Sequence, residues 1–126
     1  MKALTLIRPW AWAIVASTKR IENRTWIPYK NMIGQRIAIH AGQKLDAWDF
    51  QVIGHLHGSE PDASCEDQGI VGTAILTGVV TESEDPWFNG PYGWTLDDVV
   101  RLPAPIPCKG AQGFWNVPAD ILRKIA

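Results

Sequence analysis

The chain has 126 residues, of which 46% are hydrophobic, and its 12 basic and 13 acidic side chains leave a net charge of −1. This length and apolar content fit one domain with a single core over residues 1–126, and they exclude a disordered or low-complexity chain. The two cysteines, Cys65 and Cys108, have no CxxC spacing, so they predict reduced thiols and offer no thiolate metal site.

Hydrophobic periodicity and the positions of Pro and Gly predict the elements in chain order. A first strand over 2–7 precedes a short buried helix over 10–17, because that segment is apolar on every side and Pro9 suits a helix start. Two further strands are expected over 19–26 and 35–42.

The middle of the chain carries the longest periodic segments. Apolar residues at helical spacing predict an amphipathic helix over 44–57, and the polar stretch 58–69 predicts an exposed, mobile loop. Segment 70–80 is rich in β-branched residues and predicts a strand that its interior glycines bend sharply. After a turn-rich connection over 85–93, segment 94–102 fits either a strand or a helix.

The chain closes with a strand over 113–117 and a short helix over 118–125, with Pro118 at the helix start. Together these elements predict an α+β fold. Its sheet is a small, mostly antiparallel β-barrel of about five to six strands, closed or nearly closed, with two to three packed helices.

The first 18 residues loosely resemble a secretory signal, since an early lysine precedes an apolar stretch and small residues. Arg8 and Pro9 interrupt that stretch, and its longest clean run is too short to span a bilayer. We therefore expect a cytoplasmic protein that does not bind a membrane.

The charges segregate along the chain. Residues 1–45 hold eight basic residues and one acid, residues 46–100 hold eleven acids and no Lys or Arg, and residues 101–126 hold four basic residues and one acid. The net charge argues against a general nucleic-acid binder, but a polarised chain can present a positive cleft to a phosphate-bearing ligand. The alternative is that solvated charges intermix in space.

The motif KRIENRTW, residues 19–26, raises the main functional question. As a strand it places Arg20, Glu22, Arg24 and Trp26 on one face and Lys19 on the other, so Glu22 can pair with either arginine. Flanking cations favour the ionised carboxylate, and they would lower the pKa of Lys19 toward that of a base or nucleophile. The alternative is an exposed ladder of weak surface ion pairs.

Other candidate residues are less specific. Lys109 lies among glycines that allow a close backbone approach to a ligand, and Trp10 could stack on a base, although His40 and Trp10 also fit structural roles. His55 and His57 do not share a helix face, so neither a metal nor a cofactor is expected.

The segment LTLIRPWAWAIVASTKRIENRTW closely resembles the opening signature of the ASCH (activating signal cointegrator homology) domain, whose pattern is a strand, Pro-Trp-Ala, a helix and Lys-x-hydrophobic-Glu-x-Arg-x-Trp. IAIHAG and PIPCKGAQGFWNV resemble its third-strand and closing motifs. The matching residues of the first segment are Pro9, Trp10, Ala11, Lys19, Ile21, Glu22, Arg24 and Trp26.

The resemblance implies a PUA-like barrel with a cleft beside the first helix and an RNA-related role. It implies that Lys19, Glu22 and Arg24 line that cleft, with Trp10 largely buried at its floor. Arg8 stands where the family commonly has Gln, which would add a positive charge at the rim, and His40 and Lys109 are expected nearby.

Three functions follow as hypotheses. The leading one is binding of RNA, a nucleotide or a nucleoside in this positively charged cleft. The second is an enzyme, because some members hydrolyse the acetyl amide of N4-acetylcytidine and ribonuclease activity is attributed to others, with Lys19 and Glu22 as the catalytic residues. The small amidohydrolase branch has a nucleophilic Thr where this chain has Glu22, which weighs against direct transfer of that activity. The third is a protein-interaction module.

Overall fold

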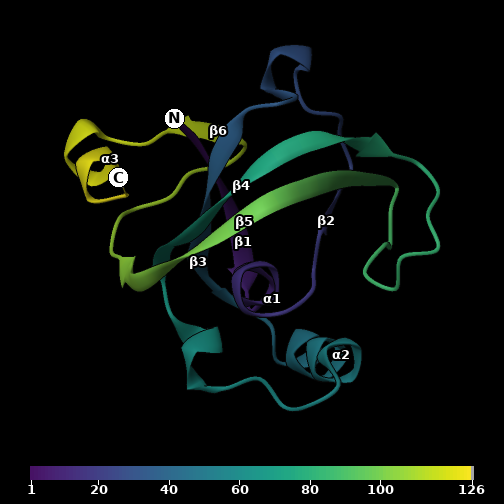
Figure 1. The fold of residues 1–126 in the computed structure, drawn as a ribbon. Helices are drawn as coiled ribbons and strands as arrows, with labels where there is room; N and C mark the ends of the chain where they lie inside the picture. The colour runs from purple at the N-terminus through teal and green to yellow at the C-terminus, as the bar shows by residue number, and fades with distance from the viewer. Residues whose placement is uncertain (126) are drawn as a thin grey trace.

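A computed structural model describes residues 1–125. It contains six strands, three α-helices and two short 3₁₀ helices (Figure 1). In chain order these are β1 (Lys2–Arg8), α1 (Trp10–Ala16), β2 (Ile21–Arg24), η1 (Lys30–Met32), β3 (Arg36–Leu45), α2 (Ala47–His57), η2 (Ala63–Glu66), β4 (Gly69–Val80), β5 (Tyr92–Ile106), β6 (Phe114–Asn116) and α3 (Ala119–Ile125).

The strands form one sheet in the order β2-β5-β4-β3-β1-β6, in which β1 and β3 are parallel and the other neighbours are antiparallel. The α+β class and the mostly antiparallel six-strand sheet are confirmed. The sheet bends strongly but stays open, because its edge strands β2 and β6 are not paired with each other in the part of the chain described here.

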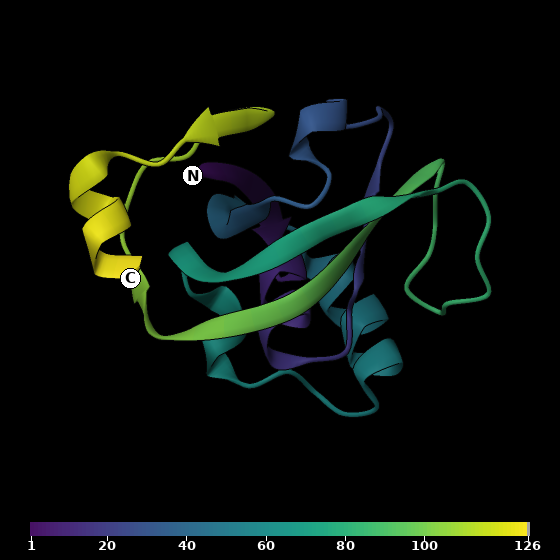
Figure 2. The ribbon, with the colours of Figure 1, turned by 45° about the horizontal axis from the view of Figure 1, so that its top comes forward.

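Strand β4 produces much of the bend. Its pairing with β5 shifts register three times, and two of the shifts adjoin Gly72 and Gly78. At Gly72 the chains approach so closely that a Cβ atom would lie 2.5 Å from Val100 O and 2.6 Å from Val15 Cγ1. Figure 2 shows the long β4–β5 hairpin crossing the molecule, with α2 on one side and β6 and α3 on the other.

Helix α1 packs against β1, β3, β4 and β5, which explains why its sequence is apolar all round. Ala11, Ala13 and Ile14 are fully buried, and Ile14 belongs to the main core together with residues of every long strand. Helix α1 is therefore in contact with four of the six strands of the sheet.

Several predicted boundaries differ from the structure. Helix α2 begins at Ala47 rather than residue 44, because Asp46 caps it by accepting a hydrogen bond from Trp48 N at 2.9 Å, and Gly58 ends it with φ of +93°. Segment 94–102 is strand, as part of β5. The polar stretch 58–69 is more ordered than a plain loop, since it contains η2 and buries Cys65.

Both cysteines are free thiols, and burial raises the pKa of each. Of the helices among residues 1–125, none has the length and apolar character needed to cross a membrane.

We expect Gly72→Ala to lower the free energy of unfolding by about 1–3 kcal/mol, because the new methyl group would overlap a carbonyl that belongs to the neighbouring strand. Gly78→Ala is the matched control on the same strand, since its Cβ would lie 3.4 Å from Thr95 Oγ1. The control should change stability by less than about 1 kcal/mol. Urea denaturation of both variants tests this, and equal stabilities would contradict the close approach.

Candidate functional site

A cleft of about 630 Å³ lies between β1, β2, α1, α2 and the connection from β4 to β5. We call it the Lys19 cleft. Its lining residues are Thr5, Leu6, Ile7, Trp10, Lys19, Glu22, Asn23, Arg24, Trp48, Asp49, Val52, Leu56, Pro86, Trp87, Phe88 and Asn89. Four of the residues predicted from sequence to bind a ligand, Trp10, Lys19, Glu22 and Arg24, therefore lie in one cleft.

A short chain of ion pairs forms one wall of the Lys19 cleft. Lys19 Nζ lies 3.2 Å from Glu22 Oε1, and Arg24 Nε donates to Glu22 Oε2 at 3.0 Å. Lys19 also donates to the carbonyl of Ile21 and lies 5.7 Å from the centre of the Trp10 ring. Lys19 is 1% exposed and Glu22 is 8% exposed, so the Lys19–Glu22 pair is buried and the Arg24–Glu22 pair is partly buried, unlike the exposed ladder that the sequence left open.

Burial sets the protonation chemistry of Lys19. Loss of hydration lowers the pKa of its amine below the ordinary value of 10.5, and the Glu22 carboxylate opposes that shift. Repulsion by Arg24 lowers the pKa further but is a smaller cause. The direction predicted from the sequence is therefore confirmed, while the main physical cause is desolvation and not the neighbouring cations.

Arg20 takes no part in this chain of charges. Its guanidinium donates to the carbonyls of Ile14 and Lys19, both at 2.9 Å, and to that of Ser17 at 3.3 Å. The bonds to Ile14 and Ser17 satisfy carbonyl groups at the carboxyl end of α1 that have no partner within the helix, and the bond to Lys19 holds the turn that follows. Glu22 consequently pairs with Arg24, as the strand pattern allowed, and with Lys19 in place of Arg20.

Aromatic side chains form much of the remaining wall. Most of the Trp10 surface is buried, as expected, since this residue packs against the core, and its indole donates to Asp49 Oδ2 at 2.8 Å. Trp87 is buried and donates to Thr18 Oγ1 at 3.0 Å, whereas Trp48 on α2 is 67% exposed. Trp48, Trp87 and Phe88 were not identified as site residues from the sequence, although the turn-rich segment 85–93 marked the connection that carries two of them.

Asn23 fixes the connection that carries Trp87 and Phe88. Its side-chain amide donates to Trp87 O at 3.0 Å, and its oxygen accepts from the backbone amides of Asn89 and Gly90 at 2.8 and 3.0 Å. Because both ends of this amide are used, Asn23 holds the aromatic wall against β2.

A second cleft of about 660 Å³ adjoins the first at Thr5 and Arg24, and we call it the Lys109 cleft. Its lining residues are Thr5, Arg24, Trp26, His40, Ala41, Gly42, Gln43, Gln68, Cys108, Lys109, Gly110, Ala111, Gln112 and Gly113. His40 and Lys109 therefore lie beside the predicted cleft but in this second hollow.

His40 is fully engaged by the protein. Burial lowers the pKa of His40 below 6.5, which favours the neutral ring at pH 7. Nε2 lies 2.9 Å from Cys108 O and must donate to it, which assigns Nδ1 as the acceptor for the Thr5 hydroxyl at 3.1 Å. Trp115 Nε1 in turn donates to Thr5 Oγ1 at 3.0 Å. His40 is thus a positioning residue for the turn that bears Lys109.

Arg8 lines neither cleft, in contrast to its expected place at the rim. Its guanidinium donates to Glu66 O at 2.6 Å and to Gln43 O at 2.8 Å. These bonds join the end of β1 to β3 and η2, so the structure gives Arg8 a bracing contact.

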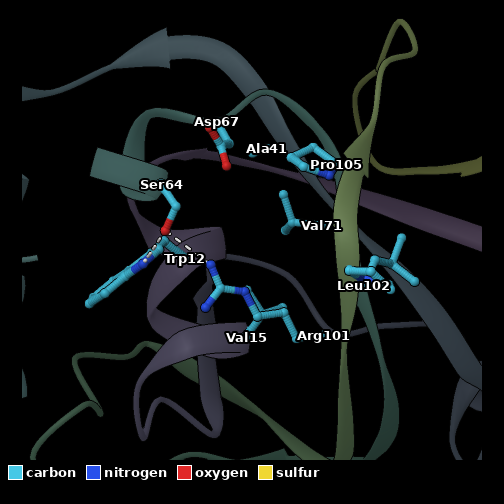
Figure 3. A pocket seen from close by; sticks show the side chains of 10 residues that line it. Trp12, Val15, Ala41, Ser64, Asp67, Val71, Arg101, Leu102 and Pro105 are labelled. Atoms are coloured by element: carbon cyan, nitrogen blue, oxygen red, sulfur yellow. Dashed lines mark hydrogen bonds between the residues drawn. The ribbon is translucent and has the colours of Figure 1, made fainter. Parts of the chain in front are cut away.

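A third pocket, of about 480 Å³, lies on another face of α1 and is shown in Figure 3. Apolar side chains such as Val15, Val71 and Leu102 line it, and Ser64 Oγ accepts from Trp12 Nε1 at 3.2 Å and from Arg101 Nη2 at 3.0 Å. None of the residues predicted from sequence lies in it, and its central polar groups already bond to one another.

The sequence model of the ASCH domain matches residues 4–89, which is more than half of the chain. A comparison with curated proteins gave no match. Among solved structures, the fold is similar to that of a mutant ZmASCH protein from Zymomonas mobilis, with a TM-score of 0.60 and 17% sequence identity over 98% of this chain and 94% of that one. At this identity the likeness shows a shared fold. Lys19, Glu22 and Arg24 lie within the matched range, and Lys109 lies outside it.

The lowered pKa of Lys19 predicts a specific pH dependence of stability. Between the pKa of Lys19 in the folded state and 10.5, the unfolded chain binds more protons than the folded one. The free energy of unfolding of the wild type, relative to Lys19→Met, should therefore rise as the pH approaches 10.5. Urea denaturation from pH 7 to pH 10.5 measures this difference, with Lys124→Met as a control for the lost charge. A difference that falls with pH would contradict the assignment.

Proposed function

The chain belongs to the ASCH domain family, and from this membership we propose that its Lys19 cleft binds RNA or a modified nucleotide. One observation carries the proposal: a row of charges, Lys19–Glu22–Arg24, of which Lys19 and Glu22 are buried, lies in a cleft whose other walls are largely aromatic. Burying charges is costly, so a buried row facing a cavity favours a binding role over a role in stability alone.

The walls suit a flat, heteroaromatic ligand. Trp10, Trp48 and Phe88 offer ring faces on which a nucleobase can stack, and stacking of this kind tolerates any base. Glu22 and Asp49 supply carboxylate oxygens, and Lys19 and Arg24 supply donors, so that both kinds of hydrogen-bonding edge on a base can be matched. A volume of about 630 Å³ is in the usual range for small-molecule sites.

Exposed Trp48 is the residue most available for stacking, and Trp48→Ala should weaken binding of a short single-stranded RNA. Loss of one stacked base costs about 1–3 kcal/mol, or roughly 5- to 150-fold in affinity. Tyr29→Ala is the matched control, because Tyr29 is 69% exposed and lies outside both clefts. Fluorescence anisotropy with labelled RNA measures the affinities.

Equal affinity of Trp48→Ala and the wild type would place the bound base elsewhere. No binding of any RNA, nucleotide or nucleoside by the wild type would instead favour the protein-interaction hypothesis.

A second candidate function is hydrolysis of an acylated nucleoside such as N4-acetylcytidine. The observation that favours it is the lowered pKa of Lys19, since an amine with a lowered pKa gives up its proton more readily beside a carboxylate. Glu22 would orient a water whose oxygen attacks the acetyl carbon, and the amide would leave as the free amine with acetate as the second product. Thr5 carries the one hydroxyl group among the described residues that line the Lys19 cleft, and its Oγ1 bonds to His40 and Trp115.

Glu22→Gln separates the two functions. A binding protein should lose modest affinity for RNA or gain some, because the amide of Gln keeps an oxygen that accepts hydrogen bonds while a negative charge leaves the cleft. An enzyme that uses Glu22 to activate water should lose on the order of 10²–10⁴ in rate while it still binds. RNA binding and release of acetate from N4-acetylcytidine are measured on the same preparations, with Glu60→Gln as the exposed control. Efficient deacetylation by Glu22→Gln would refute the catalytic role of this carboxylate.

A further inference from the structure

Arg24 stands where the two clefts meet. Its Nε and Nη2 atoms donate to Glu22 Oε2 and to Thr5 O, at 3.0 and 3.1 Å. Nη1 makes no hydrogen bond to the protein within residues 1–125, and 22% of the side chain is exposed. The guanidinium is therefore held in place by two bonds while it keeps donors for a ligand that extends across the junction.

The two clefts differ in the charges of their walls. The Lys19 cleft is aromatic and holds the carboxylates Glu22 and Asp49 as well as its two cations. The described residues of the Lys109 cleft include the cations Arg24 and Lys109 and the amides of three glutamines, but no Asp or Glu. A phosphate group is thus favoured in the Lys109 cleft, where no carboxylate opposes it, while a base is favoured in the Lys19 cleft.

The turn that carries Lys109 is anchored on both sides of this residue. On one side Cys108 O accepts the hydrogen bond from His40 Nε2. On the other side Gly110 packs so closely on β1 and β3 that a Cβ atom would lie 2.5 Å from Thr5 Oγ1 and 2.6 Å from His40 Cε1. Lys109 itself is exposed. Its backbone is fixed and its ammonium group reaches solvent, which is the arrangement a surface cation needs to meet a phosphate.

We propose that the Lys109 cleft binds the phosphate that follows or precedes a base held in the Lys19 cleft, with Arg24 and Lys109 as its cationic partners. The ligand is then a phosphodiester-linked RNA strand, and the protein selects it over a free nucleoside. This inference rests on the proposed binding of a base in the Lys19 cleft, and it specifies the ligand class that such a base belongs to.

The test compares cytidine, cytidine 3′- and 5′-monophosphate, and hexacytidylate, together with the adenosine series. Affinities are measured by calorimetry for the wild type, Lys109→Gln and Gly110→Ala. Lys124→Gln is the control, because it removes an exposed lysine of α3 that lines neither cleft.

Wild-type protein should bind the hexanucleotide and one of the monophosphates about 3- to 10-fold more tightly than the nucleoside, as expected for one added charged contact. Lys109→Gln should lose that advantage and leave nucleoside affinity unchanged. Its slope of log affinity against log salt should be shallower by about 0.7 for the hexanucleotide, since one fewer phosphate is neutralised. Gly110→Ala should also weaken phosphate-bearing ligands selectively, because the turn must shift, and Lys124→Gln should match the wild type.

The inference is overturned if the protein binds the nucleoside as tightly as the phosphate-bearing ligands and if Lys109→Gln changes neither nucleoside affinity nor RNA affinity. In that case the base site in the Lys19 cleft stands and the Lys109 cleft has no part in recognition. Absence of binding by nucleoside and RNA alike would refute the proposed function itself, and with it this inference. If Lys124→Gln lost as much affinity as Lys109→Gln, the contribution of Lys109 would be general electrostatic attraction. That result would also overturn the inference.

Discussion

The ion pairs of Glu22 connect parts of the chain that no strand pairing connects. Within the described part of the chain, strand β2 pairs with β5 alone, and β1 pairs with β3 and β6, so β2 and β1 are not joined by strand pairing. Arg24 bridges the two strands by bonding both to Glu22 and to the backbone of Thr5. Lys19 adds a contact with the Trp10 ring of α1. The same charges that line the cleft therefore also define its width, since they set how far β2 stands from β1 and α1.

The Lys19–Glu22–Arg24 row thus lines the cleft and also bridges β2 to β1 and α1. Removing one partner of a buried pair leaves a charge without compensation and destabilises by several kcal/mol, whereas a paired row adds little to stability by itself. Glu22 limits the cost by accepting from two cations through its two oxygens. The paired charges are thereby held in place on one wall of the cleft, opposite its aromatic side chains.

Sequence reasoning reached much of the fold because the periodic segments are long and consistent. It allowed Glu22 to pair with Arg20 or Arg24, and Arg24 is the partner because both residues lie in β2, but it placed Lys19 on the opposite face. Lys19 precedes the strand, where its amide bonds to Ala13 O at 3.2 Å, and the alternation of strand faces does not apply there. The partners of Arg20 could not be predicted for a related reason, because they are the backbone carbonyls of Ile14, Ser17 and Lys19, at the end of α1 and in the turn after it. The aromatic wall depends on how α2 and the β4–β5 connection fold back over β2, which local pattern does not encode. The second cleft is likewise a feature of the tertiary structure, because the turn around Lys109, which His40 anchors, forms part of its lining.

The unequal exposure of the tryptophans gives the protein an optical property. The indoles of Trp12, Trp87 and Trp94 are between 0% and 5% exposed, whereas that of Trp48 is 67% exposed at the mouth of the Lys19 cleft. A quencher dissolved in water collides mainly with Trp48, and the emission of this residue falls at longer wavelength than that of its buried counterparts. The intrinsic fluorescence of the chain thus has a buried component that the quencher reaches poorly and a quenchable component dominated by Trp48, with smaller shares from the partly buried Trp10, Trp26 and Trp115.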